Sequence, residues 1–298
     1  MRADNARLLK TATYASVVTA ALLIVAKLIA WLMTGSVSIL ASLVDSVMDA
    51  GASLVNLFAV RYSLQPADAE HRFGHGKAEA LAGLGQATFI AGSAVFLVLH
   101  AIDRLLHPQP LSDLGVGVTV IVVAIVATLA LLALQHHVIR RTGSTAIRAD
   151  ALHYATDLGT NVATIVALVL AQLGWYILDP IFALGIAAYI LYSAGRIVRD
   201  AVQLLMDREL PEDERERILR IVRGAPQVLG VHGLRTRQSG QTRVIQLHVE
   251  LPDALPLLEA HQITREVERQ LRRVYSDSDI IIHQDPVSLG DEYSPDSA

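Results

Sequence analysis

The sequence predicts a membrane all-α bundle of six transmembrane helices, followed by a cytosolic α+β domain of the ferredoxin-like or metallochaperone-like kind. The 298 residues are 52% hydrophobic and 18% charged, a composition common in membrane proteins and rare in single soluble domains. The apolar residues form six stretches, each long enough to cross a bilayer. From Met206 onward the composition becomes charged and amphipathic, which predicts a separate domain.

The six predicted spans are separated by short turn signals rich in Gly, Pro, Ser and Thr. Together they make a transmembrane domain of residues 1–205. We expect them at about Thr13–Met33, Val37–Arg61, Lys77–Leu99, Leu114–Ile139, Ala149–Gly174 and Leu178–Leu204.

The basic residues near the span ends predict the orientation of the bundle. One side holds Arg104 alone. The other side holds Arg2, Arg7, Lys10, Arg61, Arg72, Lys77, Arg140, Arg141, Arg148, Arg196, Arg199 and Arg208. Since loops rich in Lys and Arg stay on the cytoplasmic side, both termini are predicted to lie in the cytoplasm.

The predicted cytosolic domain covers residues 206–289, and an acidic tail of residues 290–298 is predicted to be disordered. Amphipathic segments, the first of them after the start signal Pro211, predict two helices, and alternating apolar residues predict three strands. Their order along the chain is αββαβ, which favours an open α+β sandwich. The elements are expected at Glu212–Arg223, Val231–Arg237, Arg243–Leu251, Leu257–Val274 and Asp279–Asp285.

Charge and cysteine content exclude several classes of function. A net charge of -4 lacks the basic footprint that nucleic-acid binding requires. The sequence has no cysteine, which excludes disulfides and thiolate metal sites. Any bound metal must therefore be held by His and carboxylate side chains, as suits zinc, iron(II) or manganese.

Two predicted spans carry paired metal-ligand side chains inside the membrane. Asp45 and Asp49 are four residues apart in the second span, and His153 and Asp157 are four apart in the fifth. This spacing puts each pair on one face of a helix. Unpartnered acids are costly in a bilayer, and a divalent cation would offset that cost. The alternative is that each acid snorkels or forms hydrogen bonds within the bundle.

A third group of ligand-type residues follows the second span in a glycine-containing loop. Asp68, His71 and His75 have a spacing that suits a metal site. The alternative is that these histidines are simply solvated.

The cytosolic domain has its own scattered histidines. The ligand-type residues fall on four predicted elements, and the last two share one face of a strand: His232, His248, His261, and His283 with Asp285. A carboxylate between histidines could bridge two ions, so a binuclear site is one interpretation. The other interpretation is that these are scattered surface histidines with no bound metal.

These residues resemble the cation diffusion facilitator family, most closely its bacterial ferrous-iron and zinc efflux branch. The resemblance covers Met1 to about Leu289 and includes the DxxxD and HxxxD pairs. It also includes the segment HRFGHGKAE at His71–Glu79 and the segment IIHQDP at Ile281–Pro286. Asp at position 45, where the stricter zinc members differ, leaves the choice among zinc, iron(II) and cadmium open.

The resemblance implies a role for each group of residues. Asp45, Asp49, His153 and Asp157 look like the transport site, and the loop and cytosolic groups look like two further metal sites. Leu152 matches a hydrophobic gate position. Lys77 and Asp207 match a charge interlock at a dimer interface.

The expected function is proton-coupled export of divalent cations, with Zn²⁺ the first expectation and Fe²⁺ or Cd²⁺ transported alternatives. The expected assembly is a homodimer in the bacterial inner membrane, with protons as counter-substrate. Two other classes of protein use similar ligands, an intramembrane metalloenzyme and a metal-gated channel or sensor. The sequence contains no HExxH motif and no serine elbow, which weighs against a hydrolase.

Overall fold

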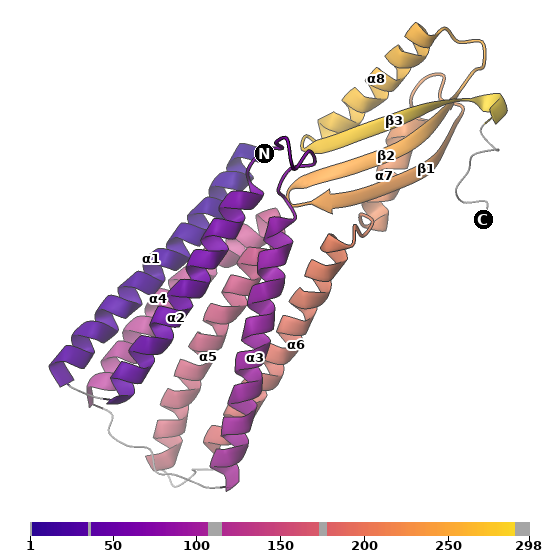
Figure 1. Ribbon diagram of the computed structural model, residues 1–298. Coiled ribbons are helices and arrows are strands. Elements are labelled where there is room, and N and C mark those ends of the chain that lie inside the picture. Colours follow the sequence, from indigo (N-terminus) through magenta and orange to yellow (C-terminus); the bar gives the residue numbers. More distant parts are fainter. Residues whose placement is uncertain (1, 35–36, 107–114, 173–177, 290–298) are drawn as a thin grey trace. The chain divides into compact units, whose positions relative to one another are not determined.

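The computed structural model describes residues 2–34, 37–106, 115–172 and 178–289 of the chain. It divides into two compact units between Val202 and Gln203. The first unit is a bundle of long helices that lie lengthwise beside one another (Figure 1). Its helices are α1 (Arg2–Thr34), α2 (Val37–Ser63), α3 (Ala78–Leu106), α4 (Gly115–Thr142), α5 (Thr145–Gln172) and α6 (Leu178–Leu205).

Among the described residues, α1, α3, α4 and α6 are long and apolar enough to cross a membrane. The other two helices, α2 and α5, have 27 and 28 residues. At about 1.5 Å per residue each is roughly 40 Å long, which also exceeds the bilayer core. They differ from the other four by carrying the acidic residues of the predicted transport site.

Alanine and other small residues dominate the contacts between these helices. One cluster joins α3, α5 and α6 through Ala87, Ala149 and Ala194, and small side chains let helices approach closely. Large apolar side chains point outward instead, including Leu32 at 69% exposed and Leu99 at 60%. Such an exterior suits contact with lipid.

Several helices extend beyond the apolar stretches that predicted them. The first helix begins at Arg2, not Thr13, and α3 continues to Leu106, not Leu99. The fifth begins at Thr145, not Ala149. The added turns mix the helix formers Ala and Leu with charged Arg, Lys and Asp residues, and the charged residues hide these turns from a hydropathy criterion.

The second unit contains α7 (Glu212–Arg223), β1 (Gly230–Ser239), β2 (Thr242–Leu251), α8 (Leu257–Val274) and β3 (Ser278–Pro286). The sheet has the order β1-β2-β3, with β1 and β2 antiparallel and β2 and β3 parallel. Gly240, at φ +58°, begins the two-residue turn between β1 and β2. The helix α8 makes the crossover that a parallel pair requires.

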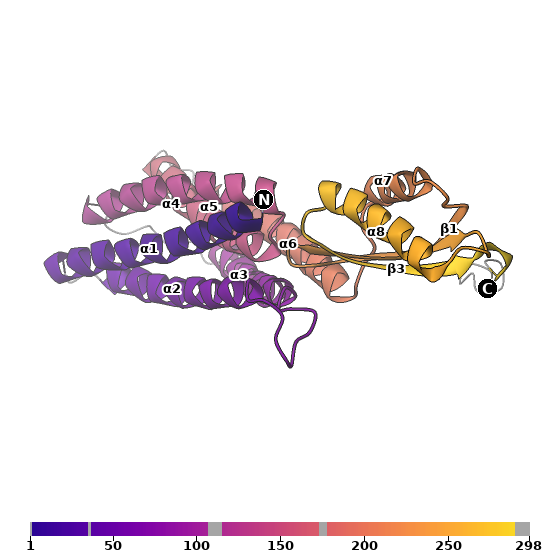
Figure 2. The ribbon, with the colours of Figure 1, turned by 90° about the horizontal axis from the view of Figure 1, so that it is seen from above.

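Both helices of this unit pack on one face of the sheet (Figure 2). The alternation along β2 explains this, because Ile245, Leu247 and Val249 are buried while His248 and Glu250 lie on the other face. The predicted fold class, a helical membrane bundle with a C-terminal α+β unit, is confirmed. The domain limits 1–205 and 206–289 stay predictions, and the tail 290–298 lies outside the described residues.

Candidate functional site

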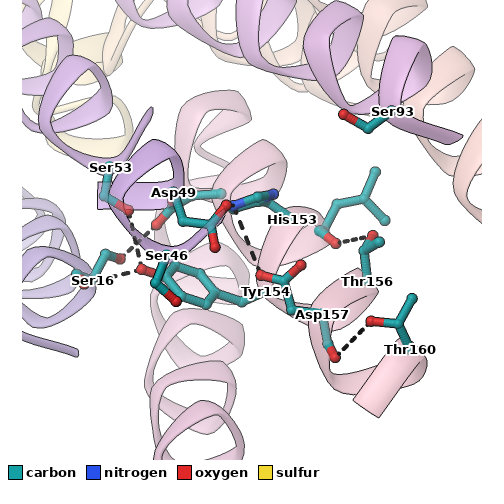
Figure 3. A network of polar contacts seen from close by, with 12 residues as sticks. Ser16, Ser46, Asp49, Ser53, Ser93, His153, Tyr154, Thr156, Asp157 and Thr160 are labelled. Carbon is teal, nitrogen blue, oxygen red and sulfur yellow. Dashed lines mark hydrogen bonds and ion pairs between the residues drawn. The ribbon is translucent and has the colours of Figure 1, made fainter. Parts of the chain in front are cut away.

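The structure brings together ligand-type side chains from α2 and α5. Oδ1 of Asp49 lies 3.0 Å from Nε2 of His153, and the same nitrogen lies 3.8 Å from Oδ2 of Asp157. Each residue offers a ligand atom within 4.8 Å of the other two (Figure 3). One nitrogen and two carboxylates at these separations form a donor set that suits Zn²⁺ or a similar cation.

The fourth predicted member of this group is Asp45. Its backbone belongs to α2, but its side chain lies outside the described residues. The contribution of Asp45 to the site therefore stays a prediction, based on its position one helical turn before Asp49.

The three ligand-type residues border a cavity of about 520 Å³ between α2, α3, α5 and α6. Its other walls are mostly apolar, with a few hydroxyl groups among them. A polar cluster in such a cavity is typical of a transport path through a helical bundle. The remaining lining residues are Met48, Phe89, Ile90, Ser93, Ala94, Phe96, Leu97, Thr156, Thr160 and Ile190.

A second polar network lies behind this cluster and was missed by the sequence analysis. The carboxylate of Asp150 is fully buried. It accepts hydrogen bonds from Ser16 Oγ at 2.5 Å, Gln135 Nε2 at 2.7 Å and Gln86 Nε2 at 3.1 Å. Asp150 thus ties α5 to α1, α4 and α3.

Tyr154 connects that network to the metal-ligand cluster. Its hydroxyl donates to the backbone oxygen of Ser16 at 3.1 Å and lies 3.1 Å from Ser53 Oγ on α2. Its ring meets the ring of His153 edge-on, with 5.6 Å between centroids (Figure 3). These contacts fix α5 against α1 and α2 one residue from His153.

Leu152 is 7% exposed and packs in the cluster that joins α3, α5 and α6. Its neighbours there include Ile90 and Ile190, which also line the cavity. A bulky side chain packed beside the cavity is compatible with the predicted gate, which stays a prediction.

The loop after α2 gathers all three of its predicted ligands. His75 Nε2 lies 3.2 Å from Asp68 Oδ2, and His71 Nδ1 lies 3.5 Å from Asp68 Oδ1. The two imidazole rings are 4.6 Å apart. His75 is buried, and its Nδ1 has no hydrogen-bond partner among the described residues. A buried nitrogen left unpaired is what a metal ion would satisfy.

The backbone of this loop holds Asp68 in its charged form. The N–H of His71 donates to Asp68 Oδ1 at 2.6 Å, and the N–H of Glu70 donates to the same oxygen at 2.9 Å. The bond from His71 is the main reason that the pKa of Asp68 lies below its ordinary value. A carboxylate kept ionised is the form that binds metal.

The cytosolic sheet aligns three of its predicted ligands across neighbouring strands. His232 on β1 pairs with His248 on β2, and His248 pairs with His283 on β3. Asp285 lies beside all three histidines, at 3.4 Å from His232 Nε2, 2.8 Å from His248 Nδ1 and 3.2 Å from His283 Nε2. One carboxylate among three imidazoles has the chemistry to bridge metal ions.

Glu250 belongs to this cluster and was missed by the sequence analysis. Its Oε1 lies 3.0 Å from His232 Nδ1. Two residues after His248 on β2, it shares the face of that histidine, which is the signal that could have identified it. A carboxylate bonded to the second ring nitrogen orients an imidazole for metal binding.

The structure does not place His261 in this cluster. His261 is exposed on α8, and the cluster found among the described residues consists of His232, His248 and Asp285, with His283 adjacent. The role of His261 as a ligand stays a prediction.

Lys77 and Asp207 lie in different units. Lys77 directly precedes α3, and Asp207 follows α6 with a positive φ of 58°. The carboxylate of Asp207 is 3.2 Å from Arg237 Nη1 on β1. The interlock between Lys77 and Asp207 stays a prediction.

Fold and site together define an integral membrane protein with three clusters of candidate metal ligands, in its bundle, in a loop and on its C-terminal sheet. Residues 13–206 match the family description of a cation efflux transmembrane domain, and residues 210–287 match that of a cation efflux protein cytoplasmic domain. The chain belongs to the cation efflux family. It is accordingly a transporter and not an enzyme, and the matched cytoplasmic domain is a dimerisation domain.

Curated relatives match along almost their whole length. The chain is 54% identical over 289 residues to the cation-efflux pump FieF of Escherichia fergusonii, covering 97% of this chain and 96% of the relative. It is 55% identical, with the same coverage, to the cation-efflux pump FieF of Yersinia enterocolitica. A solved structure of the putative zinc transporter CzrB in its zinc form is 32% identical over 28% of this chain and 94% of that one, with a TM-score of 0.25.

Proposed function

We propose that the chain exports divalent transition-metal cations from the cytoplasm in exchange for protons. The observation that carries the proposal is the cluster of Asp49, His153 and Asp157 at a cavity inside the helical bundle. Close relatives are named cation-efflux pumps, which supports export as the direction of transport. Asp45 is the fourth ligand in the proposal.

Coupling follows from the chemistry of the ligands. A carboxylate or an imidazole binds either a proton or a metal ion at a given lone pair, so the two cargoes exclude each other. In a state open to the cytoplasm, deprotonated ligands take the cation. In a state open to the other side, protons compete for the same atoms. Imidazole ordinarily titrates near physiological pH, which makes His153 the natural proton carrier.

Alternating access requires the bundle to expose the cluster to one side at a time. We propose Leu152, packed between α3 and α6, as the hydrophobic gate. The distribution of basic residues supports a bacterial inner-membrane protein with both termini in the cytoplasm.

Zinc is the proposed principal cargo, with iron(II) and cadmium as alternatives. Carboxylate and imidazole ligands accept all three ions, and nothing in the donor set selects one of them. The proposed cargo rests on the ligand chemistry and on the efflux function named for the relatives.

The loop and cytosolic clusters are proposed as further metal sites. The unpaired Nδ1 of buried His75 and the carboxylate between three histidines support this assignment. In a homodimer, the exposed position of His261 on α8 makes this residue available to the partner subunit. Lys77 and Asp207 are proposed to fix the dimer interface.

Transport in proteoliposomes tests the proposal. The full-length protein is reconstituted, and uptake of zinc, iron(II), cadmium and manganese is compared at a fixed proton gradient. The proposal expects uptake of at least one of these cations to collapse when the gradient is dissipated. Uptake of the same size with and without a gradient would indicate a channel.

A further inference from the structure

A second cavity, of about 370 Å³, lies between α4, α5 and α6, and Asp49, His153 and Asp157 are not among the residues that line it. Of its lining residues, only the proposed gate residue Leu152 has a part in the proposed transport cycle. Unlike the transport cavity, it contains basic groups and no carboxylate in its lining. The lining residues are His136, Ile139, Arg148, Ala151, Leu152, Ala155, Tyr189, Ser193, Arg196 and Ile197.

Arg148 retains unused donor capacity in this cavity. Its Nη2 donates to Asp200 Oδ2 at 2.7 Å. Its Nε is buried and has no hydrogen-bond partner among the described residues. A buried N–H without an acceptor is unfavourable, and a guanidinium can satisfy several acceptors at once. The Nε–H of Arg148 is therefore free to donate to an oxygen atom of a bound ligand, in addition to the bond from Nη2 to Asp200.

Arg196 adds a second guanidinium from the neighbouring helix. It is exposed on α6, with its central carbon 6.0 Å from the centroid of the Tyr192 ring. Asp200 is the carboxylate that the structure bonds to Arg148, so the two arginines and one Asp leave an excess of positive charge. Arginine pairs bind phosphate oxygens with strong, charge-assisted hydrogen bonds.

Exposed tyrosines and a basic residue lie at this cavity. Arg148 lies in the first turn of α5, and Arg196 lies about 14 Å from the end of α6 at the helical rise. Tyr189 and Tyr192 are exposed beside it, at 63% and 66%. Exposed tyrosines and basic residues together mark the level of the lipid headgroups. The apolar wall of Ala151, Ala155 and Ile197 suits the carbon atoms of a lipid.

We propose that this cavity binds an anionic phosphate group, supplied by the headgroup of an acidic phospholipid. Basic pockets between transmembrane helices are known to hold such headgroups. Arg148 and Leu152 are four residues apart on α5, so both face the cavity from the helix that carries His153 and Asp157. A bound lipid thus contacts the helix that the proposed function requires to move.

Lipid retention by the full-length protein tests this proposal directly and independently of transport. The purified protein is mixed with dioleoylphosphatidylglycerol or with zwitterionic dioleoylphosphatidylcholine, and bound lipid is counted by native mass spectrometry. The wild-type protein is expected to retain more of the anionic phosphatidylglycerol than of the zwitterionic phosphatidylcholine. Arg196→Gln and the double variant Arg148→Gln/Arg196→Gln are expected to retain about tenfold less of it.

Arg199→Gln is the matched control. Arg199 is exposed on the same helix, three residues from Arg196, and does not line the cavity. Its replacement removes the same charge and is expected to leave lipid retention unchanged. Arg196→Gln carries the test if the double variant unfolds, because Arg196 is exposed and its replacement is expected to leave the fold intact.

Three results would overturn the proposal. Equal losses in Arg196→Gln and Arg199→Gln would show that anionic lipid is held by general surface charge. No loss in either variant would show that Arg196 does not hold the lipid. Displacement of phosphatidylglycerol by inorganic phosphate at the same concentration would assign the cavity to a free anion instead of a lipid.

Discussion

Oδ1 of Asp49 lies 3.0 Å from Nε2 of His153, although the two residues belong to helices that are far apart in the sequence. Asp157, one turn along α5, approaches the same nitrogen. Three ligand-type side chains from α2 and α5 therefore converge at a cavity in the bundle. Behind the cluster, the contact between Tyr154 and Ser53 joins α5 to α2, and Asp150 ties α5 to α1 and α4.

Asp150→Asn is expected to destabilise the protein by about 1–3 kcal/mol. An amide presents an NH2 group where the Asp150 carboxylate now accepts from Ser16, Gln135 and Gln86. The measurement is the midpoint of thermal unfolding in detergent. Asp103→Asn, at an exposed position on α3, is the control, and equal midpoints for both variants would contradict the account.

Tyr154→Phe is expected to cost about 1 kcal/mol in the free energy of unfolding while leaving zinc binding in place. The change removes a hydroxyl that bonds Ser53 and the backbone of Ser16, but it keeps the ring beside His153. Tyr192→Phe, on the exposed face of α6, should have no effect. Loss of zinc binding in Tyr154→Phe would instead make the hydroxyl part of the site.

Asp68→Asn and Asp68→Ala separate the two roles of this residue. Asn keeps an oxygen that accepts the N–H groups of Glu70 and His71, so the turn should persist while metal affinity at the loop falls. Asp68→Ala should lose both the turn and the metal affinity of the loop. Hydrogen exchange of residues 68–75, with and without zinc, measures the two effects, and identical exchange in the two variants would contradict the assignment.

The same loop should respond to acid in one direction. Since the pKa of Asp68 in the folded protein lies below its ordinary value of 3.8, its stabilising effect is present above that value and is lost as the pH falls through the folded pKa. The protection factors of the loop amides in the wild-type protein, which are corrected for the intrinsic pH dependence of exchange, should therefore fall only below about pH 4 from this cause. Asp68→Asn should not show that fall in protection.

Asp285→Ala is expected to lower the amount of zinc that the full-length protein retains per protomer. This carboxylate contacts all three clustered histidines, so its removal leaves them without a shared acidic ligand. Metal content measured by mass spectrometry after gel filtration tests the expectation. Asp279→Ala, exposed at the start of the same strand, is the control, and equal metal content in both variants would contradict the assignment.

The sequence predicted the fold class because its signals are local. Apolar length identified the six helices of the bundle, and Pro211 marked the start of α7 at the observed residue. Hydropathy failed at the polar ends of helices, as at Arg2 in α1. Charged helix formers continue a helix without making it more apolar.

The candidate sites were predicted in part, because their ligands follow helix and strand periodicity. That periodicity identified Asp49, His153 and Asp157, but not which distant residues support them. Asp150, Gln86 and Gln135 are polar residues inside predicted spans, which was a usable signal. Their partnership depends on how α1, α3, α4 and α5 pack, and no local pattern encodes that.

The most direct test of the central claim is zinc-dependent proton flux in proteoliposomes containing Asp157→Ala. Ser93→Ala is the matched control, since Ser93 lines the same cavity but is not a ligand of the cluster. Thermal unfolding is measured first, to show that both variants have the same unfolding midpoint as the wild-type protein. The account predicts that Asp157→Ala gives no more flux than liposomes without protein, while Ser93→Ala transports as the wild type does. Flux through Asp157→Ala at the wild-type rate would contradict the claim that this cluster carries both metal and protons.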